Sequence, residues 1–231
     1  MEIGVTRREV KYFLNRSSAD TLKARLSAFL PIDRAGPPDG YLVRSLYFDT
    51  LNDRDFQDKI NGIETRQKIR LRIYGAGDAT AKLEVKQKQG MDQWKYSVTF
   101  TREDAELLIQ CRYEVLLEKY KSAFVQQTLR KMQMESYIPR TIVEFNRVAF
   151  TQTSNDTRIT FDSSIRETES DFDLFSPDLH LRPILCPVIL EVKFNRFLLS
   201  YIKSALVLAD RMPISISKYC LGRQIGYSGG Y

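Results

Sequence analysis

Charged and apolar residues alternate with period two in several segments of the chain. Clear examples are 69–73 (IRLRI), 82–88 (KLEVKQK) and 190–194 (LEVKF). Because successive side chains of a strand point to opposite faces, each segment predicts a strand with one apolar and one ionic face. We expect eight strands, over about 5–14, 41–49, 64–74, 79–90, 93–100, 140–151, 157–165 and 185–194. An even number of strands suits a closed antiparallel sheet.

Turn and helix signals fill the segments between these strands. Glycine-containing turns at 75–78 and 90–92 predict hairpins that join the third, fourth and fifth strands into a meander. Apolar residues at helical spacing predict one helix from a Ser18 cap to Leu30 and one beginning after a Thr101 cap. Further helices are expected over about 113–137 and 197–209, and a long surface loop over 166–183.

No interior linker and no internal repeat divides the chain. The simplest organisation is a single domain over 1–231, of the α+β class. In it an eight-stranded antiparallel barrel, a tunnel with a charged interior, is surrounded by helices. The helices need the apolar faces of the strands, which leaves the ionic faces to point inward.

The ionic faces are mainly basic. Their lysines and arginines are Arg70, Arg72, Lys82, Lys86, Lys88, Lys95, Arg147, Arg158, Lys193 and Lys218. Such a density of like charge repels itself in a partly dehydrated space and requires anions to neutralise it. Phosphate suits these residues, because arginine offers a bidentate fork and lysine a movable point charge. The alternative is an open sheet whose charged face meets water without a ligand.

The overall charge agrees with an anionic partner. A formal net charge of +6 and a pI near 9.2 favour phosphate compounds, nucleic acid or a membrane surface, unless the mild basicity has no specific role. Nucleic acid rests on the pI alone, because no recognition motif of RNA-binding sheets is present. A Walker loop is also absent.

The scarcity of cysteine and histidine narrows the chemistry. Three cysteines without a CxxC spacing and one histidine, His180, argue against a disulfide framework, a zinc site and a His-based triad. The chain shows no signal peptide and no apolar run long enough to cross a bilayer. We therefore expect a cytoplasmic protein with no membrane segment of its own. A membrane-anchored partner stays an open question.

Carboxylates on the ionic faces are candidate metal ligands. Glu191 alternates with Lys193, and Glu84 shares a face with Lys82 and Lys86. Glu9, Glu144 and Asp162 are further candidates. Oxygen ligands without histidine or cysteine favour magnesium or manganese, ions that often take their other ligands from substrate phosphates and water. We interpret Glu191 as a metal ligand, and Glu84 and Glu144 as salt-bridge partners.

Eight short motifs carry a family resemblance. In order they are 9–12 (EVKY), 43–49 (VRSLYFD), 69–72 (IRLR), 83–86 (LEVK), 145–147 (FNR), 158–162 (RITFD), 190–193 (LEVK) and 217–219 (SKY). Together they resemble the VTC domain, the catalytic domain of the vacuolar transporter chaperone polyphosphate polymerase. That domain belongs to the triphosphate tunnel metalloenzymes, whose fold is an eight-stranded antiparallel tunnel. The resemblance extends over about residues 7–222.

The resemblance implies roles for individual residues. Phosphates would be held by Lys11, Arg44, Arg70, Arg72, Lys86, Lys95, Arg147, Arg158, Lys193, Ser217 and Lys218. Of these, Arg70, Arg72, Lys86 and Lys218 would act in catalysis together with Glu191, the ligand of Mn²⁺ or Mg²⁺. Arg7 stands where the superfamily has a first glutamate, which weakens the hydrolase interpretation, and Phe145 stands where a tyrosine is expected. No SPX domain or transmembrane segment accompanies the motifs, which suggests a stand-alone, bacterial-type version.

The implied function is that of a polyphosphate polymerase, a phosphotransferase of the polyphosphate kinase type. It would transfer the γ-phosphate of ATP to a growing polyphosphate chain inside a basic tunnel. The nucleophile would be an already ionised terminal phosphate oxygen, so the enzyme must supply alignment and charge neutralisation. ATP and inorganic polyphosphate would be the partners. The alternatives are a metal-dependent triphosphatase that hydrolyses a short triphosphate and a non-catalytic polyphosphate-binding module.

Overall fold

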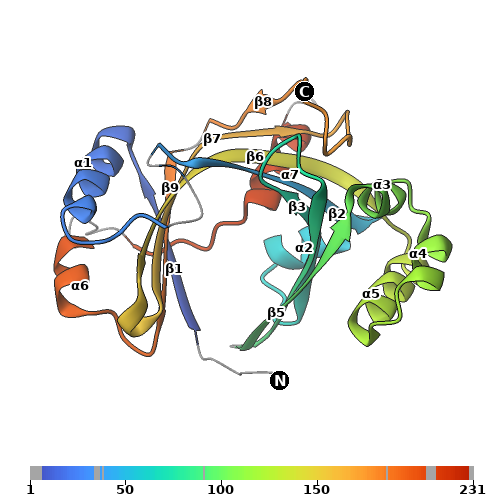
Figure 1. Cartoon of the computed structure of the whole chain (residues 1–231), viewed down its shortest axis with the longest axis horizontal. Coiled ribbons are helices and arrows are strands. Elements are labelled where there is room, and N and C mark those ends of the chain that lie inside the picture. The colour runs from blue at the N-terminus through green and yellow to red at the C-terminus, as the bar shows by residue number, and fades with distance from the viewer. Residues whose placement is uncertain are drawn as a thin grey trace. The chain divides into compact units, whose positions relative to one another are not determined.

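A computed structural model describes residues 7–33, 37, 39–90, 92–185, 187–206 and 212–228. Its main strands are β1 (Arg7–Leu14), β2 (Tyr41–Thr50), β3 (Arg66–Ile73), β4 (Thr80–Gln89), β5 (Asp92–Thr101), β6 (Tyr137–Gln152), β7 (Thr157–Thr168) and β9 (Val188–Asn195) (Figure 1). All eight predicted strands are confirmed. A two-residue strand, β8 (Arg182–Pro183), is added by pairing with β7.

The strands form a sheet with the hydrogen-bonded order β1-β9-β7-β6-β2-β3-β4-β5. The pairs whose register is resolved are antiparallel, and β3, β4 and β5 form the predicted meander. The α+β class and the eight-stranded antiparallel sheet are therefore confirmed. Closure of this sheet into a tunnel stays a prediction.

Seven helices and one 3₁₀ turn occur in the described part of the chain. They are α1 (Arg16–Ser27), α2 (Arg54–Ile60), α3 (Arg102–Ile109), α4 (Tyr113–Lys119), α5 (Ala123–Met134), η1 (Thr153–Asn155), α6 (Ser200–Leu206) and α7 (Lys218–Ser228). No helix among these residues is both long enough and apolar enough to cross a membrane.

Several helix predictions need correction. The cap of α1 is Asn15 rather than Ser18, because the Asn15 side chain accepts a hydrogen bond from the Ser18 backbone N–H. The Thr101 cap of α3 is confirmed by the bond from Asp104 N–H to Thr101 Oγ1. The helix expected over 113–137 is two helices, α4 and α5, and part of the fourth predicted helix, 207–209, lies outside the described residues.

The segment 166–183 is less loop-like than expected. β7 continues to Thr168, and β8 pairs with it through Arg166 and Glu167. Of the cysteines, Cys111 and Cys220 have free thiols, whereas Cys186 lies outside the described residues.

The chain divides into two compact units, each built from three separate segments. Unit 1 comprises 1–42, 145–165 and 185–216, and unit 2 comprises 43–144, 166–184 and 217–231. β6 and β7 each contribute residues to both units. The single domain over 1–231 stays a prediction, and each unit is described by itself below.

Unit 1 has an apolar core between its helices and one face of its strands. Leu22 and Leu26 of α1 and Ile202 of α6 pack in one cluster with Phe161 of β7 and Leu190 of β9. The opposite faces of β1, β7 and β9 carry Lys11, Arg158, Glu191 and other charged residues. The strands of this unit therefore have the two-faced character that their alternation predicts.

Unit 2 repeats this arrangement with other elements. Leu71, Leu83 and Phe100 of β3, β4 and β5 pack in one cluster with Leu108 of α3 and Leu129 of α5. The residues between these apolar positions, such as Arg70, Glu84 and Lys86, lie on the other face. In this unit, too, helices cover the apolar face of the strands, and the charged residues lie on the opposite face.

Candidate phosphate- and metal-binding clusters

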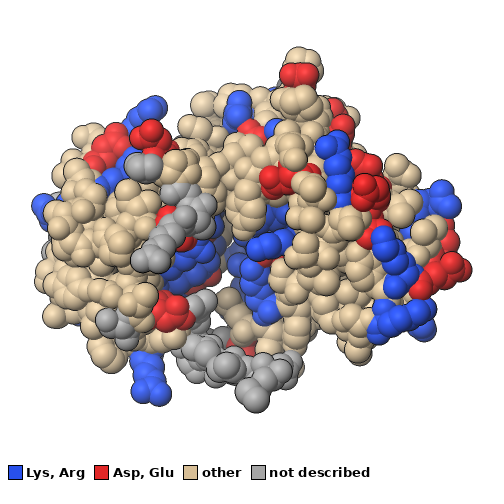
Figure 2. Space-filling view, in the orientation of Figure 1, with Lys and Arg blue, Asp and Glu red and all other residues tan. Residues whose placement is uncertain are grey.

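The ionic face of β3, β4 and β5 in unit 2 carries eight cations and one carboxylate. Strand register aligns them in four rows across the strands: Arg66–Lys88–Gln93, Lys68–Lys86–Lys95, Arg70–Glu84–Ser97 and Arg72–Lys82–Thr99. Figure 2 shows lysine and arginine side chains gathered over the strands of this unit, whereas basic and acidic side chains are interspersed over its helices α4 and α5. The strand face is therefore strongly positive.

Glu84 is the carboxylate at the centre of this face. It is 1% exposed, and its Oε2 accepts from Arg70 Nε at 2.8 Å and lies 3.6 Å from Arg72 Nη1. Its Oε1 forms an ion pair with Lys95 Nζ. Burial alone would raise the pKa of Glu84, but Arg70, Arg72 and Lys95 together hold the pKa well below its usual range. Glu84 is thus a salt-bridge partner, as predicted, and it fixes three cations at once.

Arg70 and Arg72 receive further support from β2. Arg70 Nη1 donates to the Tyr47 hydroxyl at 3.0 Å, and its guanidinium lies 5.7 Å from the centre of the Tyr47 ring. Arg72 Nε reaches Ser45 Oγ at 3.4 Å. These contacts fix the orientation of both guanidinium groups before any ligand binds.

One row consists of lysines alone. Lys68, Lys86 and Lys95 lie directly opposite one another on β3, β4 and β5. Like charges at directly opposed positions destabilise a sheet. Burial lowers the pKa of Lys95, and the charges of Arg70 and Arg72 lower it further, against the opposing effect of Glu84. An anion bound along this row would relieve the repulsion.

The start of α7 adjoins the lysine row. Lys68 Nζ donates to Ser217 Oγ, which also accepts a long bond of 3.4 Å from the Cys220 backbone N–H. Ser217 therefore caps α7, a structural role beyond the predicted phosphate contact. Lys218, the first residue of that helix, is 9% exposed.

Arg44 is separated from the other predicted phosphate ligands by its contacts. Its Nε donates to Glu144 Oε2 at 2.7 Å, and its Nη1 donates to the carbonyls of Leu174 and Ser176. Glu144 also pairs with Arg166. Because Arg44 is 4% exposed and its donors hold the segment around 174–176, we leave it out of the proposed site.

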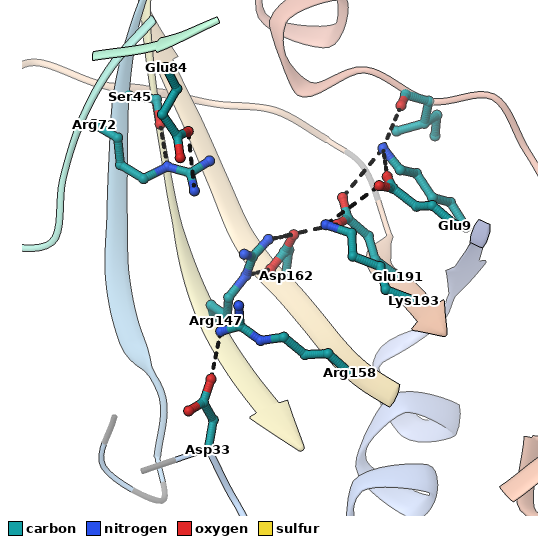
Figure 3. Close-up of polar contacts among 12 residues, drawn as sticks. Glu9, Asp33, Ser45, Arg72, Glu84, Arg147, Arg158, Asp162, Glu191 and Lys193 are labelled. Atoms are coloured by element: carbon teal, nitrogen blue, oxygen red, sulfur yellow. Dashed lines mark hydrogen bonds and ion pairs between the residues drawn. The ribbon is translucent and has the colours of Figure 1, made fainter. Parts of the chain in front are cut away.

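Unit 1 carries a second ionic cluster with a different charge balance (Figure 3). Its ion pairs join four cations, Lys11, Arg147, Arg158 and Lys193, to four carboxylates, Glu9, Asp33, Asp162 and Glu191. Lysine and arginine charges are therefore matched by carboxylates in this cluster. The cluster of unit 1 therefore differs in charge balance from the strand face of unit 2, where cations are in excess.

Glu191 lies at the centre of the second cluster. Its carboxylate is 3.4 Å from Lys11 Nζ, 3.4 Å from Lys193 Nζ and 4.0 Å from Arg147 Nη2. Burial alone would lower the pKa of Lys11, but Glu191 and Glu9 raise it above its usual value. Lys11 also donates to the carbonyl of Ile216 at 3.1 Å.

Arg147 and Arg158 have carboxylate partners of their own. Arg147 forms a bidentate pair with Asp162, with both N···O distances 2.7 Å. Burial would lower the pKa of Arg147, but Asp162 and then Glu191 keep it above its usual value. Arg158 donates to Asp33 at 2.6 Å and to the Tyr41 hydroxyl at 3.0 Å. Both arginines are thus oriented by their own unit.

Two carboxylates of this cluster share the same two lysines. Glu9 and Glu191 both pair with Lys11 and with Lys193, which draws the two carboxylates together. No group of three or more histidine, cysteine, aspartate or glutamate residues in the described ranges could hold an ion. Two carboxylates would suffice for magnesium or manganese only where phosphate oxygens and water complete the coordination shell.

Comparison with known proteins identifies the family of this chain. The model of the VTC domain matches residues 6–227, and the chain belongs to this family. The family implies dependence on a divalent metal and a phosphate-related activity on triphosphate or polyphosphate. No curated protein matches the sequence significantly.

Solved structures support the fold at low sequence identity. A protein from Bacillus halodurans described as a candidate adenylate cyclase has a TM-score of 0.56 at 13% identity, covering 93% of this chain and 96% of its own. HpAC1 from Hippeastrum, described with a dominant triphosphatase activity, has a TM-score of 0.57 at 13% identity, with 94% of each chain covered. These likenesses concern the fold alone.

Sequence reasoning missed three side chains at these clusters, Asp33, Lys68 and Thr160. Asp33, which pairs with Arg158, lies outside the predicted strands and gave no alternation signal. Lys68 continues the alternation of Arg70 and Arg72. It could have been predicted from the same pattern, because it directly precedes the motif at 69–72. Thr160 lies opposite Glu191. Because Thr160 is uncharged, a search for alternating charged residues could not find it.

Proposed function

We propose that this VTC-domain protein is a metal-dependent polyphosphate polymerase that transfers the γ-phosphate of ATP to a growing polyphosphate chain. The observation that carries the proposal is the excess of positive charge on the ionic face of β3, β4 and β5, where eight cations accompany one carboxylate, Glu84. Such a face repels itself unless a polyanion neutralises it. A chain of phosphates supplies many negative charges on one flexible ligand.

The proposed catalytic groups act by positioning and neutralisation. Arg70 and Arg72 are pre-oriented by Glu84, Tyr47 and Ser45, so their guanidinium groups would bind phosphate oxygens with little loss of side-chain entropy. Lys86 lies in the adjacent lysine row. Because the attacking phosphate and the γ-phosphate are both anions, neutralising their charge lowers the barrier to transfer.

The proposal assigns other residues to supporting roles. Lys68, Lys95, Ser217 and Lys218 would hold further phosphates in unit 2, with Lys218 also acting in transfer. Lys11, Arg147, Arg158 and Lys193 would do so in unit 1. Glu191, with Glu9 beside it, would hold the metal ion, which supplies positive charge on phosphate oxygens when bound.

A triphosphatase is the second candidate function. HpAC1, a structural neighbour with the same fold, is described with a dominant triphosphatase activity. Hydrolysis requires a positioned water in place of the chain end, with the same neutralisation of phosphate charge. A non-catalytic polyphosphate-binding module is the remaining alternative, in which Glu191 would pair only with its cations.

One assay separates the three functions. Purified protein is incubated with ATP and either Mn²⁺ or Mg²⁺, and the products are resolved on a polyacrylamide gel and tested for free phosphate. We expect long polyphosphate together with ADP. Free phosphate without polymer would indicate the triphosphatase, and neither product would indicate the binding module.

A further inference from the structure

The hydroxyl of Thr160 is buried without a hydrogen-bond partner among the described residues. Thr160 is 3% exposed, and its Oγ1 is shielded from solvent. Leaving a buried hydroxyl unpaired costs free energy, so such a group usually has a structural or functional explanation. A second buried donor, Arg158 Nε, also lacks a partner, and it belongs to the residue two positions earlier on the same strand face.

Strand register places Thr160 in the ionic cluster of unit 1. Thr160 lies directly opposite Glu191 of β9, which in turn lies opposite Lys11 of β1. Directly opposed residues share a face, so the Thr160 side chain is on the ionic side of the sheet. Arg158 and Asp162 flank it on the same face of β7.

The neighbours of Thr160 do not use its hydroxyl. Glu191 pairs with Lys11, Lys193 and Arg147, and Asp162 pairs with Arg147. An anion that bound among these cations would bring acceptor oxygens to two unused donors, Thr160 Oγ1 and Arg158 Nε. The side chains of Arg158 and Lys193 are 39% and 26% exposed, so the cluster is accessible from solvent beside these two cations.

We propose that Thr160 is a further phosphate-binding residue, whose hydroxyl donates a hydrogen bond to a phosphate oxygen held in the unit 1 cluster. The inference rests on the proposed function, because it takes phosphate as the ligand class. It deepens that function by adding an uncharged phosphate-binding side chain to a cluster whose other members form ion pairs.

The test compares three variants by calorimetric titration with sodium tripolyphosphate in EDTA, so that no metal contributes. Thr160→Val removes the hydroxyl and keeps the branched shape, and Thr160→Ser keeps a hydroxyl. Thr157→Val is the matched control, because Thr157 Oγ1 is also buried and unpartnered but faces the apolar side of the same strand with Ile159. Melting temperatures are measured on the same samples.

We expect Thr160→Val to weaken binding about tenfold, the loss for one hydrogen bond to a charged group, with an unchanged or higher melting temperature. Thr160→Ser should bind within about twofold of the unmodified protein, allowing for its freer rotamer. Thr157→Val should bind tripolyphosphate as tightly as the unmodified protein, and its melting temperature should change as that of Thr160→Val does.

Two results would overturn the role of Thr160 while leaving the proposed function intact. One is unchanged binding by Thr160→Val, and the other is a parallel loss of binding and of melting temperature, which indicates a structural role. If the unmodified protein itself fails to bind tripolyphosphate, the proposed function and the inference fail together.

Discussion

Glu191 is the residue whose environment most directly separates a catalyst from a binding module. It is 6% exposed and lies between Lys11 and Lys193, with Arg147 at a longer distance. A carboxylate in this position can neutralise lysines or hold a metal ion that neutralises phosphates. The two roles predict different effects of removing its charge.

We predict that Glu191→Gln lowers turnover about 100-fold, the size of effect seen when one electrostatic contact to the transition state is lost. Binding of tripolyphosphate without metal should be retained or tighter, because Lys11 and Lys193 each lose a competing carboxylate. Steady-state kinetics and calorimetry measure the two quantities. Glu106→Gln, in an exposed pair with Arg102, is the control. Unchanged turnover would remove Glu191 as a metal ligand.

Asp55 shows how burial and a neighbouring carboxylate can make the stability of the protein sensitive to pH. Asp55 of α2 is 2% exposed, and burial followed by the charge of Asp49 raises its pKa to about 7. The hydroxyl of Tyr137, which donates to Asp55 at 3.0 Å, opposes that rise in part. The folded protein thus holds a proton that the unfolded chain releases near pH 4.

This difference sets the sign of a stability prediction. A raised carboxyl pKa contributes stability that is present below about pH 4 and is lost as the pH rises through about 7. Asp55→Asn should therefore be more stable than the unmodified protein at pH 8, by roughly 4 kcal/mol, and should lose this advantage near pH 4. Urea unfolding at both pH values measures the difference, with Asp58→Asn as the control. A pH-independent difference would contradict the account.

At the scale of elements, the lysine row across β3, β4 and β5 gives a further prediction. Lys68→Gln removes one of three directly opposed like charges. It should raise the melting temperature at low salt by a few degrees, because cross-strand repulsion falls. The same substitution should weaken binding of long polyphosphate and make that binding less dependent on salt.

The control for this substitution is Lys121→Gln, which removes the same charge from the segment between α4 and α5. Melting curves and polyphosphate titrations at several salt concentrations are compared for the two variants. Equal effects of both substitutions would show that net charge, rather than the row, determines the behaviour.

Several strands, such as β3, β4 and β9, were predictable from the sequence because charged and apolar residues alternate along them and each has an apolar face to bury. Two helices were not predicted, for physical reasons. The residue before α2, Asp53, has a left-handed backbone and makes no side-chain capping bond. The first N–H groups of α2 instead donate to Asp49 and Thr50 at the end of β2, a capping arrangement that the usual spacing rules do not predict. α7 contains Gly222, which disfavours a helix in isolation but lies close to β6, where an added Cβ would be 3.2 Å from Val143.

The candidate site was predictable where charge carried the signal and not elsewhere. Arg70, Arg72 and Glu191 could be found because they alternate with apolar residues in their strands. The contacts of Arg44 with the carbonyls of Leu174 and Ser176 join residues 130 or more positions apart, which no local pattern encodes. Local sequence patterns therefore give the charge of Arg44 but not its partners.

At the scale of the whole molecule, the two units differ in how their cations are balanced. The cations of the unit 1 cluster have carboxylate partners, whereas β3, β4 and β5 of unit 2 carry a large excess of positive charge. The excess is local to this strand face, because the other charged residues of unit 2 largely offset it, and the formal net charge of +6 does not reveal it. We interpret the excess in unit 2 as the feature that selects a polyanion.

The most direct test of the proposed polymerase follows the fate of single phosphates of ATP. Purified protein is supplied with a divalent metal and with ATP labelled either at the γ-phosphate or at the α-phosphate, and the products are separated by size. The account predicts that the γ-label enters a long polymer that exopolyphosphatase degrades, while the α-label stays in ADP. Release of the γ-label only as free phosphate would contradict it.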